Sequence, residues 1–227
     1  MKTVLITGIS RGIGKAEAHK FLAENYNVIG TSIDGTADIK NDNLTVFALD
    51  LSKPDSIVSC VQHIQKSGAR IDILINNAGA LFDDEETTVI IDKLRRTLEV
   101  NLIGTINFTE HIIPLMNAGG HILNTTSSAG SLAGATDLRT THYPYHYPAY
   151  KISKAALNMY TRTLATRLSH ERTGIIVSSV HPGWVKTDMG GDEAPVTPDQ
   201  AAAQIYSLAL SRPETGQFWF NGQTYPW

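Results

Sequence analysis

Strand-like and helix-like segments alternate along the 227 residues of this chain, without a long linker, an internal repeat or a low-complexity tract. Such alternation predicts an α/β fold, in which a doubly wound parallel sheet of about seven strands carries helices on both faces. One domain, residues 1–227, is expected. Strands are expected at 2–7, 27–32, 44–49, 71–76, 119–125, 174–180 and 216–220, and helices near 13–25, 54–67, 87–117, 149–171 and 198–210.

A glycine-rich turn separates the first expected strand from the first expected helix. Thr3 to Thr7 is a short apolar strand, and Gly8, Gly12 and Gly14 follow it with the spacing GxxxGxG. In such a Rossmann-type unit, glycines let the backbone approach a pyrophosphate, and the helix N-terminus offers N–H groups and the positive end of its dipole. The unit therefore predicts a dinucleotide site, although glycines in a turn also serve turn geometry alone.

A tyrosine and a lysine lie four residues apart twice, as Tyr150 with Lys154 and as Tyr147 with Lys151. Residues at this spacing are neighbours on a helix, and a nearby ammonium favours the phenolate form of tyrosine. Pro148 suits the first position of a helix and biases Tyr147 towards extended backbone outside it. We therefore expect Tyr150 and Lys154 to handle a proton. Taken alone, this spacing is also common on ordinary helix surfaces.

Composition excludes several functional classes. The 19 basic and 22 acidic residues give a net charge of -3, which provides no electrostatic footprint for nucleic acid or an anionic membrane. The single cysteine, Cys60, excludes an internal disulfide framework and fits a reducing compartment. Met1 and Lys2 lead directly into the first strand, and no apolar run approaches the length of a membrane span. A cytoplasmic protein without a nucleic-acid or membrane partner is expected.

Polar motifs follow the expected strands at their carboxyl ends, which is where ligands bind in parallel sheets. Asn-Asn-Ala-Gly at 76–79 follows the fourth strand, Ser-Ser-Ala-Gly at 127–130 the fifth, and His-Pro-Gly at 181–183 the sixth. Together with the glycine turn and the Tyr-x3-Lys pair, these motifs resemble the short-chain dehydrogenase/reductase superfamily over essentially the whole chain. The stretch 181–191 and the ending Pro226-Trp227 are most similar to the group that contains C-factor and the Sniffer-type carbonyl reductases.

This resemblance implies an oxidoreductase that transfers a hydride between NAD(P) and a carbonyl or secondary alcohol of a small molecule. It implies that Tyr150 is the general acid/base, and that Lys154 lowers the pKa of Tyr150 and binds the nicotinamide ribose. It implies that Ser127 hydrogen-bonds the substrate oxygen, because alignment on Gly130 selects Ser127 over its neighbour. Asn101 would hold a water in a proton relay, although a buried asparagine satisfied by backbone fits the same position.

The resemblance also implies a homodimer or homotetramer, because relatives often pair through the helices near 87–117 and 149–171. A non-catalytic dinucleotide sensor or signalling protein on the same fold is the alternative function. The intact Ser127, Tyr150 and Lys154 argue against it. The residues expected to bind the cofactor are Gly8, Ser10, Arg11, Gly12, Ile13, Gly14, Ser32, Asp50, Leu51, Asn77, Ala78, Gly79, Tyr150, Lys154, Pro182, Gly183, Val185 and Thr187.

The choice between NAD and NADP depends on the end of the second strand. Eighteen residues after Gly14 lies Ser32, where an acidic residue would bond the ribose 2′-hydroxyl of NAD. Ser32 and Arg11 instead suit a 2′-phosphate, so we expect NADP rather than NAD. Asp34 either reaches a ribose hydroxyl or caps a turn before Gly35. Asp50, expected at the adenine, also suits the start of a helix.

The connection between Ser127 and Tyr150 is longer than in many relatives, and residues 138–147 are the expected insertion. Because it joins two catalytic residues, this segment is expected to form a lid or wall over the substrate site and to affect substrate preference. No metal site is expected at His142 and His146, because Pro144 interrupts helical spacing between them. The acidic run 83–86 is expected to be a solvated loop.

Overall fold

A computed structural model describes residues 1–135 and 146–227. The strands are β1 (Thr3–Thr7), β2 (Asn27–Ser32), β3 (Leu44–Ala48), β4 (Ile71–Asn76), β5 (Met116–Thr125), β6 (Ile176–Val180), β7 (Gln217–Phe220) and β8 (Gln223–Thr224). The α-helices are α1 (Gly12–Ala23), α2 (Pro54–Lys66), α3 (Ile91–Leu98), α4 (Thr105–Ile112), α5 (Pro148–His170) and α6 (Pro198–Leu210). A π-helical turn, Glu99–Gly104, joins α3 to α4, and short 3₁₀ turns lie at Ile113–Leu115 and Ser128–Gly130.

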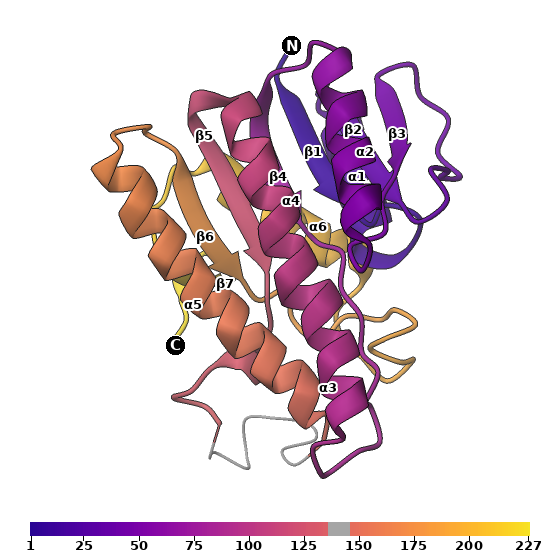
Figure 1. The fold of residues 1–227 in the computed structure, drawn as a ribbon, viewed down its shortest axis with the longest axis vertical. Coiled ribbons are helices and arrows are strands. Elements are labelled where there is room, and N and C mark those ends of the chain that lie inside the picture. The colour runs from indigo at the N-terminus through magenta and orange to yellow at the C-terminus, as the bar shows by residue number, and fades with distance from the viewer. Residues whose placement is uncertain (136–145) are drawn as a thin grey trace.

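The described strands form one sheet in the order β3-β2-β1-β4-β5-β6-β7-β8, as Figure 1 shows for most of them. All neighbouring strands are parallel except β7 and β8, which are antiparallel. Strand order reverses at β1, because Leu5 pairs with Ile29 of β2 on one side and with Leu74 of β4 on the other. Ligands of such sheets bind beyond the carboxyl ends of the strands near this reversal.

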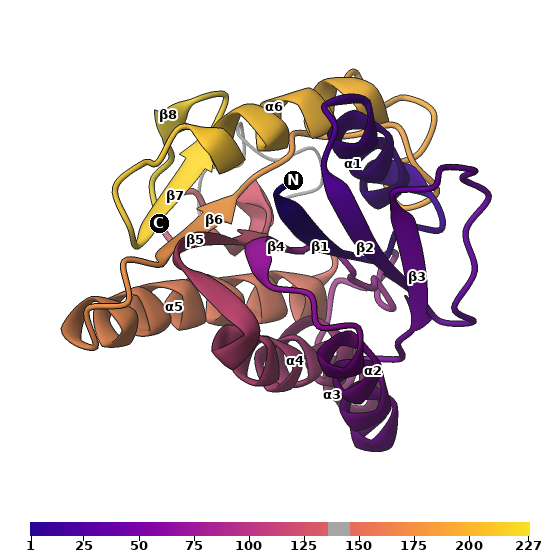
Figure 2. The same cartoon turned by 90° about the horizontal axis from the view of Figure 1, so that it is seen from above.

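Helices cover both faces of the sheet. Figure 2 shows α1 and α6 on one face, and α2, α4 and α5 on the other. Successive residues of a strand point to opposite faces, so Val4 and Ile6 pack in the cluster that includes Phe21 of α1, whereas Leu5 packs in the cluster that includes Phe108 of α4. The predicted fold class, a doubly wound parallel sheet with helices on both faces, is therefore confirmed.

Several expected boundaries differ from the structure, most clearly around the helix expected at 87–117. The expected helix 87–117 starts at Ile91 and ends at Ile112, and β5 then starts at Met116 instead of residue 119. The pairing of β4 with β5 shifts register between Ile71 and Ile73, and Gly119 in this part of β5 has a φ of 73°. The early part of β5 therefore joins the rest of the strand through an irregularity such as a bulge. An eighth strand was not expected, although Asn221-Gly222 is a strong signal for a two-residue hairpin turn.

The acidic run 83–86 is not a solvated loop throughout, so that expectation is wrong for Asp83. Its side chain is 1% exposed, and its Oδ2 accepts a hydrogen bond from the backbone N of Ala149, at 2.6 Å. The first N–H groups of a helix have no partner within the helix, and a buried carboxylate supplies one here. Tyr147 does lie outside α5 as expected, but with φ 49° and ψ 53° its backbone is left-handed, not extended.

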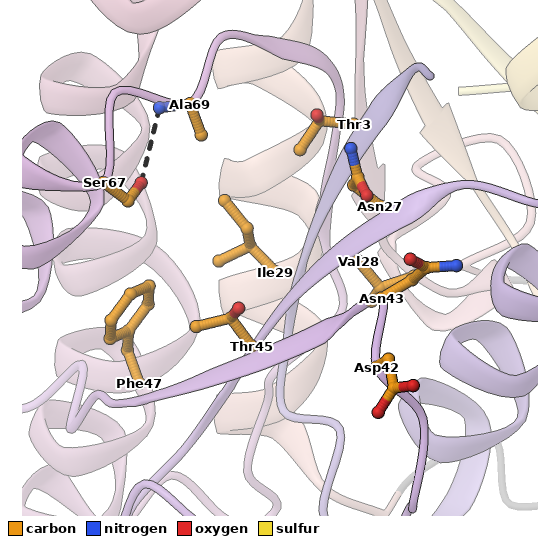
Figure 3. A pocket seen from close by; sticks show the side chains of 10 residues that line it. All are labelled: Thr3, Asn27, Val28, Ile29, Asp42, Asn43, Thr45, Phe47, Ser67 and Ala69. Carbon is orange, nitrogen blue, oxygen red and sulfur yellow. Dashed lines mark hydrogen bonds between the residues drawn. The ribbon is translucent and has the colours of Figure 1, made fainter.

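Within residues 1–135 and 146–227, no helix has the length and apolar character needed to cross a membrane. Residues 138–145 of the expected insertion, with the histidine at 142, lie outside the described residues. A surface depression at the amino ends of β1 and β2 is lined by Thr3, Asn27, Val28, Ile29, Asp42, Asn43, Thr45, Phe47, Ser67 and Ala69 (Figure 3). It lies at the opposite end of these strands from the glycine turn and contains none of the expected site residues.

A buried carboxyl in α1 makes stability depend on pH. Glu17 is 0% exposed, and neither carboxyl oxygen has a hydrogen-bond partner in the described part of the chain. Burial disfavours the charged form and raises the pKa of Glu17 from 4.5 to about 8. The folded chain thus keeps a proton that the unfolded chain loses, so this contribution to stability is full below pH 4.5 and is lost as the pH rises through about 8.

Glu17→Gln is therefore expected to raise the free energy of unfolding at pH 8 by on the order of a few kcal/mol, and to change it little at the acidic end of this range. Urea unfolding of both proteins at several pH values measures the difference. The exposed Glu193→Gln serves as the matched control. An equal effect of Glu17→Gln at all pH values would show that packing, not charge, is responsible.

Candidate functional site

The parallel strands end at one edge of the sheet (Figure 1), so the loops that follow them meet there. The glycine turn follows β1, the 76–79 motif ends β4, Ser127 follows β5, and the Pro182-Gly183 motif follows β6. The expected cofactor and catalytic residues are therefore gathered at a single edge by the topology. Ser32, at the end of β2, and Asp50 and Leu51, after β3, extend the same edge past β1.

The glycine turn has the geometry that its sequence predicts. Gly8 and Gly12 have φ values of 77° and 56°, a left-handed conformation that side chains disfavour. A Cβ on Gly14 would lie 2.3 Å from the carbonyl oxygen of Gly8, so only glycine lets α1 begin this close to the turn. The side chain of Arg11 forms no cap on α1, and no acidic residue occupies its first turn. The N-terminus of α1 therefore suits the pyrophosphate of a dinucleotide.

A threonine and an asparagine hold this turn against β4. The Thr7 hydroxyl accepts hydrogen bonds from the backbone N atoms of Asn77 and Ala78, each at 3.0 Å. The Asn77 side-chain amide donates to the carbonyl oxygens of Thr7, at 2.9 Å, and Gly8, at 3.3 Å. The side-chain amide of Asn77 thus supports the turn, and Thr7 is a site residue that the sequence analysis missed. The sequence did offer a signal for this role, because Thr7 is a hydroxyl residue at the end of a buried strand, directly before Gly8.

The end of β2 contains a serine paired with an acid. Ser32 is 4% exposed, and its hydroxyl donates to Asp34 at 3.0 Å. Asp34 also accepts from the backbone N of Thr36, at 3.0 Å, and this bond is the main reason why the pKa of Asp34 lies below its usual value. Asp34 therefore caps the turn around Gly35. Arg11 pairs with Asp188 at 2.8 Å, where both side chains are largely exposed.

The expected adenine contacts after β3 are engaged within the protein. Asp50 accepts hydrogen bonds from the backbone N and the hydroxyl of Ser52, at 3.0 and 2.6 Å, and pairs with Lys53. The Ser52 contact is the main cause that lowers the pKa of Asp50. Leu51 is buried, and a Cβ on Gly104 would lie 2.0 Å from its carbonyl oxygen. The turn at 50–53 is thus ordered by its own polar groups and packed directly against the π-helical turn.

Helix α5 brings the expected catalytic pair to the edge beside Ser127. A hydrogen bond links Tyr150 with Ser127, so the serine that alignment on Gly130 selects lies beside the phenol, and its role at the substrate oxygen stays a prediction. Lys154 is 4% exposed, its ammonium donates to the carbonyl oxygen of Thr125 at 2.9 Å, and it lies 5.4 Å from the centre of the Tyr150 ring. A Cβ on Gly130 would lie 2.7 Å from the backbone carbon of Lys154, so this glycine permits the close approach of α5.

Asn101 lies in the π-helical turn near the same lysine. Its Oδ1 accepts from the backbone N of Ala80, at 2.7 Å, and its Nδ2 donates to the Ala80 carbonyl oxygen, at 2.8 Å, and to Ser153, at 3.1 Å. A Cβ on Gly79 would lie 3.4 Å from Asn101 Oδ1 and 3.5 Å from Lys154 Nζ, which places both side chains around Gly79. The side chain of Asn101 is thus satisfied largely by backbone, and its role in a proton relay stays a prediction.

Burial controls the proton affinities of the Tyr150 and Lys154 pair. It raises the pKa of Tyr150 to about 12, although the hydrogen bond from Ser127 acts in the opposite direction. It lowers the pKa of Lys154 to about 8. Burial outweighs the other effects on Tyr150, so the expectation that Lys154 lowers the pKa of Tyr150 stays a prediction; the Lys154 ammonium bonds the Thr125 carbonyl oxygen and lies over the ring. At neutral pH the phenol therefore carries its proton and can donate it.

The loop after β6 closes the edge over the glycine turn. Pro182 and Val185 are buried, and Val185 forms a bridge with residue 196 on the return of this loop. Gly183 has a φ of 93°, which favours glycine. A Cβ on Gly12 would lie 3.3 Å from the methyl group of Thr187, so the expected carboxamide contact lies beside the expected pyrophosphate site.

Replacing the Thr7 hydroxyl tests how the turn is held. Thr7→Val keeps the shape of the side chain but leaves two part-buried N–H groups without their acceptor. We expect the free energy of unfolding to fall by about 1–3 kcal/mol. Thr7→Ser keeps the hydroxyl and should recover most of that loss. Chemical denaturation measures both variants, and equal stability of Thr7→Val and wild type would contradict the role assigned to this hydroxyl.

Known proteins share both the sequence and this arrangement. The sequence profile described as short chain dehydrogenase matches residues 2–196. The 1-hydroxy-2-glutathionyl-2-methyl-3-butene dehydrogenase of Rhodococcus sp. (strain AD45) is 31% identical over 232 residues, covering 99% of both chains. C-signal of Myxococcus xanthus is 36% identical over 168 residues, covering 69% of this chain and 93% of that protein.

Solved structures agree with these sequence relatives. The NADPH-bound carbonyl reductase from chicken fatty liver superposes with a TM-score of 0.88 at 27% identity, covering 100% of this chain and 94% of that chain. The carbonyl reductase Sniffer of D. melanogaster gives a TM-score of 0.86 at 28% identity and covers 100% of both chains. The resemblance expected from the motifs is confirmed by these matches.

Proposed function

The chain belongs to the short-chain dehydrogenase/reductase family of NAD(P)-dependent oxidoreductases, and from this premise we propose that it reduces a carbonyl of a small molecule, or oxidises the matching alcohol, with NADP as cofactor and Tyr150 as the general acid/base. The observation that carries this proposal is the hydrogen bond between Tyr150 and Ser127 beside buried Lys154. These groups share the sheet edge with the glycine turn, which suits a dinucleotide pyrophosphate.

The side chains divide the proton chemistry between them. A bound nicotinamide cofactor would supply the hydride in reduction and accept it in oxidation. The hydroxyls of Ser127 and Tyr150, which hydrogen-bond each other in the free protein, would both turn to donate to the substrate oxygen when it binds between them. Tyr150 holds its proton at neutral pH, so in reduction it would protonate the developing alkoxide. Lys154 is charged below about pH 8 and would stabilise the phenolate left behind.

Removing the phenol hydroxyl tests this assignment. Tyr150→Phe is expected to lower kcat by about 100-fold or more, because the general acid is lost while the ring and the fold remain. Tyr147→Phe should retain most activity, which separates the two tyrosine–lysine pairs. The assay is a panel of ketones, aldehydes and quinones with NADPH and NADH. Full turnover by Tyr150→Phe would refute the assignment, and dinucleotide binding by the wild type without any turnover would favour a sensor.

The preference for NADP rests on the residues around the end of β2. Ser32 is not acidic. The exposed ion pair of Arg11 with Asp188 contributes little free energy, so the guanidinium can exchange Asp188 for a 2′-phosphate. The chicken carbonyl reductase that matches this chain binds NADPH. The carboxylate of Asp34, bonded to Ser32, is the feature that favours NAD instead, since it offers an acceptor for a ribose hydroxyl.

We expect kcat/KM to be at least about tenfold higher with NADPH than with NADH. Arg11→Ala should reduce the preference for NADPH chiefly by weakening NADPH binding, because it removes the cation proposed to contact the 2′-phosphate. Asp34→Asn should leave NADPH kinetics unchanged or improve them by removing a negative charge. Steady-state kinetics with both cofactors provide the readout. A tenfold preference for NADH that Asp34→Asn abolishes would overturn the proposal in favour of NAD.

A further inference from the structure

The loop 83–86, just before α3, contacts the start of α5 at three successive points. Figure 1 shows this loop beside the end of α5 from which the helix begins. Asp83 Oδ2 accepts from the backbone N of Ala149 at 2.6 Å. The carbonyl oxygen of Glu86 accepts from the backbone N of Tyr147 at 2.9 Å, and the carbonyl oxygen of residue 84 lies 3.3 Å from Nδ1 of His146. The loop therefore holds residues 146, 147 and 149 together.

The start of α5 needs such a support for two physical reasons. Tyr147, the residue before the helix, has a left-handed backbone conformation that is strained for a bulky side chain and persists only where its surroundings enforce it. Pro148 has no N–H, so Ala149 presents the first free backbone donor of the helix. The side chain of the residue just before a helix normally accepts from such a donor, and it is usually serine, threonine, aspartate or asparagine. In α5 this residue is Tyr147, which cannot play that part. Asp83, far away in sequence, supplies the missing acceptor.

The carboxylate of Asp83 is buried with only one of its two oxygens hydrogen-bonded among the described residues. It is 1% exposed, and its second oxygen, Oδ1, has no hydrogen-bond partner among the described residues. Burying a carboxylate with one oxygen unpaired is unfavourable unless the contact it makes is needed. Burial lowers the pKa of Lys151, and the attraction of Asp83 acts in the opposite direction, so part of the charge of Asp83 is balanced by the first turn of α5.

The first turn of α5 carries the phenol at the centre of the proposed function. Tyr150 directly follows Ala149, and its ring packs edge-to-face against the ring of Tyr147, with the ring centres 6.0 Å apart. The Ser153 hydroxyl donates to the Tyr150 carbonyl oxygen at 2.7 Å, which fixes the other side of this turn. A shift at Ala149 therefore becomes a shift of the Tyr150 hydroxyl relative to Ser127, and proton transfer is sensitive to displacements on the order of 1 Å.

We propose that Asp83 is a positioning residue for the proton-transfer step: by accepting from the N–H of Ala149, it fixes the first turn of α5 and so sets the Tyr150 hydroxyl against Ser127. This inference rests on the proposed function of Tyr150. Asp83 touches neither substrate nor cofactor in this scheme and acts only through the helix. It should therefore affect kcat through Tyr150 while leaving dinucleotide binding at the glycine turn nearly untouched.

The experiment compares wild type with Asp83→Ala, Asp83→Asn and the control Glu85→Gln, which neutralises an exposed carboxylate of the same loop. Asp83→Ala is expected to lower kcat by about tenfold or more, with KM and the Kd for NADPH within about twofold of wild type. Asp83→Asn keeps an acceptor and should recover part of kcat, and it keeps the test valid if Asp83→Ala folds poorly. Unchanged kcat in both variants, or losses that follow the folded fraction measured by circular dichroism, would overturn the inference.

A double-mutant cycle with Tyr150→Phe separates positioning from general loss of structure. If Asp83 acts through the phenol, Asp83→Asn should cost little further activity once Tyr150 is phenylalanine, so the two effects are not additive. Additive losses would contradict the inference, because Asp83 would then act by another route. The same set also distinguishes the two hypotheses. Full activity of Tyr150→Phe refutes the proposed function and with it this inference, whereas loss in Tyr150→Phe with full activity in both Asp83 variants refutes the inference alone.

Discussion

A buried chain of side-chain hydrogen bonds fixes α5 against the sheet, and the geometry of the site depends on it. Asn76 of β4 donates to Asn124 of β5 at 2.8 Å, and Asn124 donates to Thr161 of α5 at 2.8 Å. Ser179 of β6 donates to the same threonine at 2.9 Å. Leaving one such buried group unpaired costs about 1–3 kcal/mol. Helix α5 therefore cannot slide along the sheet without breaking its hydrogen bonds to β5 and β6, and its register is set before any ligand binds.

That register reaches the catalytic pair through the helix itself. Lys154 and Tyr150 lie on α5 on the N-terminal side of Thr161, and the close approach permitted by Gly130 brings them to the end of β5. At the N-terminus of α5, Asp83 and the backbone of Glu86 hold the start of the helix. The phenol is thus fixed from both sides along the chain. Burial between these supports also explains why its pKa is raised and that of Lys154 is lowered.

Local rules were enough to predict the order of elements, the glycine turn and the placement of Tyr150 inside α5 with Tyr147 outside it. Each of these follows from residues that are near one another in sequence. The Asp83 contact with Ala149 and the Thr7 contacts with Asn77 and Ala78 join residues that are far apart, and nothing near Asp83 distinguishes it from an ordinary acidic loop residue. The raised pKa of Tyr150 was not foreseen for a related reason: spacing shows that two side chains are neighbours, but not how deeply both are buried.

The absence of a side chain at Gly104 has a consequence for how the two ends of the cofactor site communicate. Because any Cβ there would collide with the Leu51 carbonyl oxygen, the expected adenine end and the turn that carries Asn101 are in direct backbone contact. Any further restriction of the 50–53 turn by a bound nucleotide would also restrict the 99–104 turn. The two ends are then linked thermodynamically, and the linkage is reciprocal. Adenosine fragments without a nicotinamide should accordingly tighten the surroundings of Asn101 and Lys154.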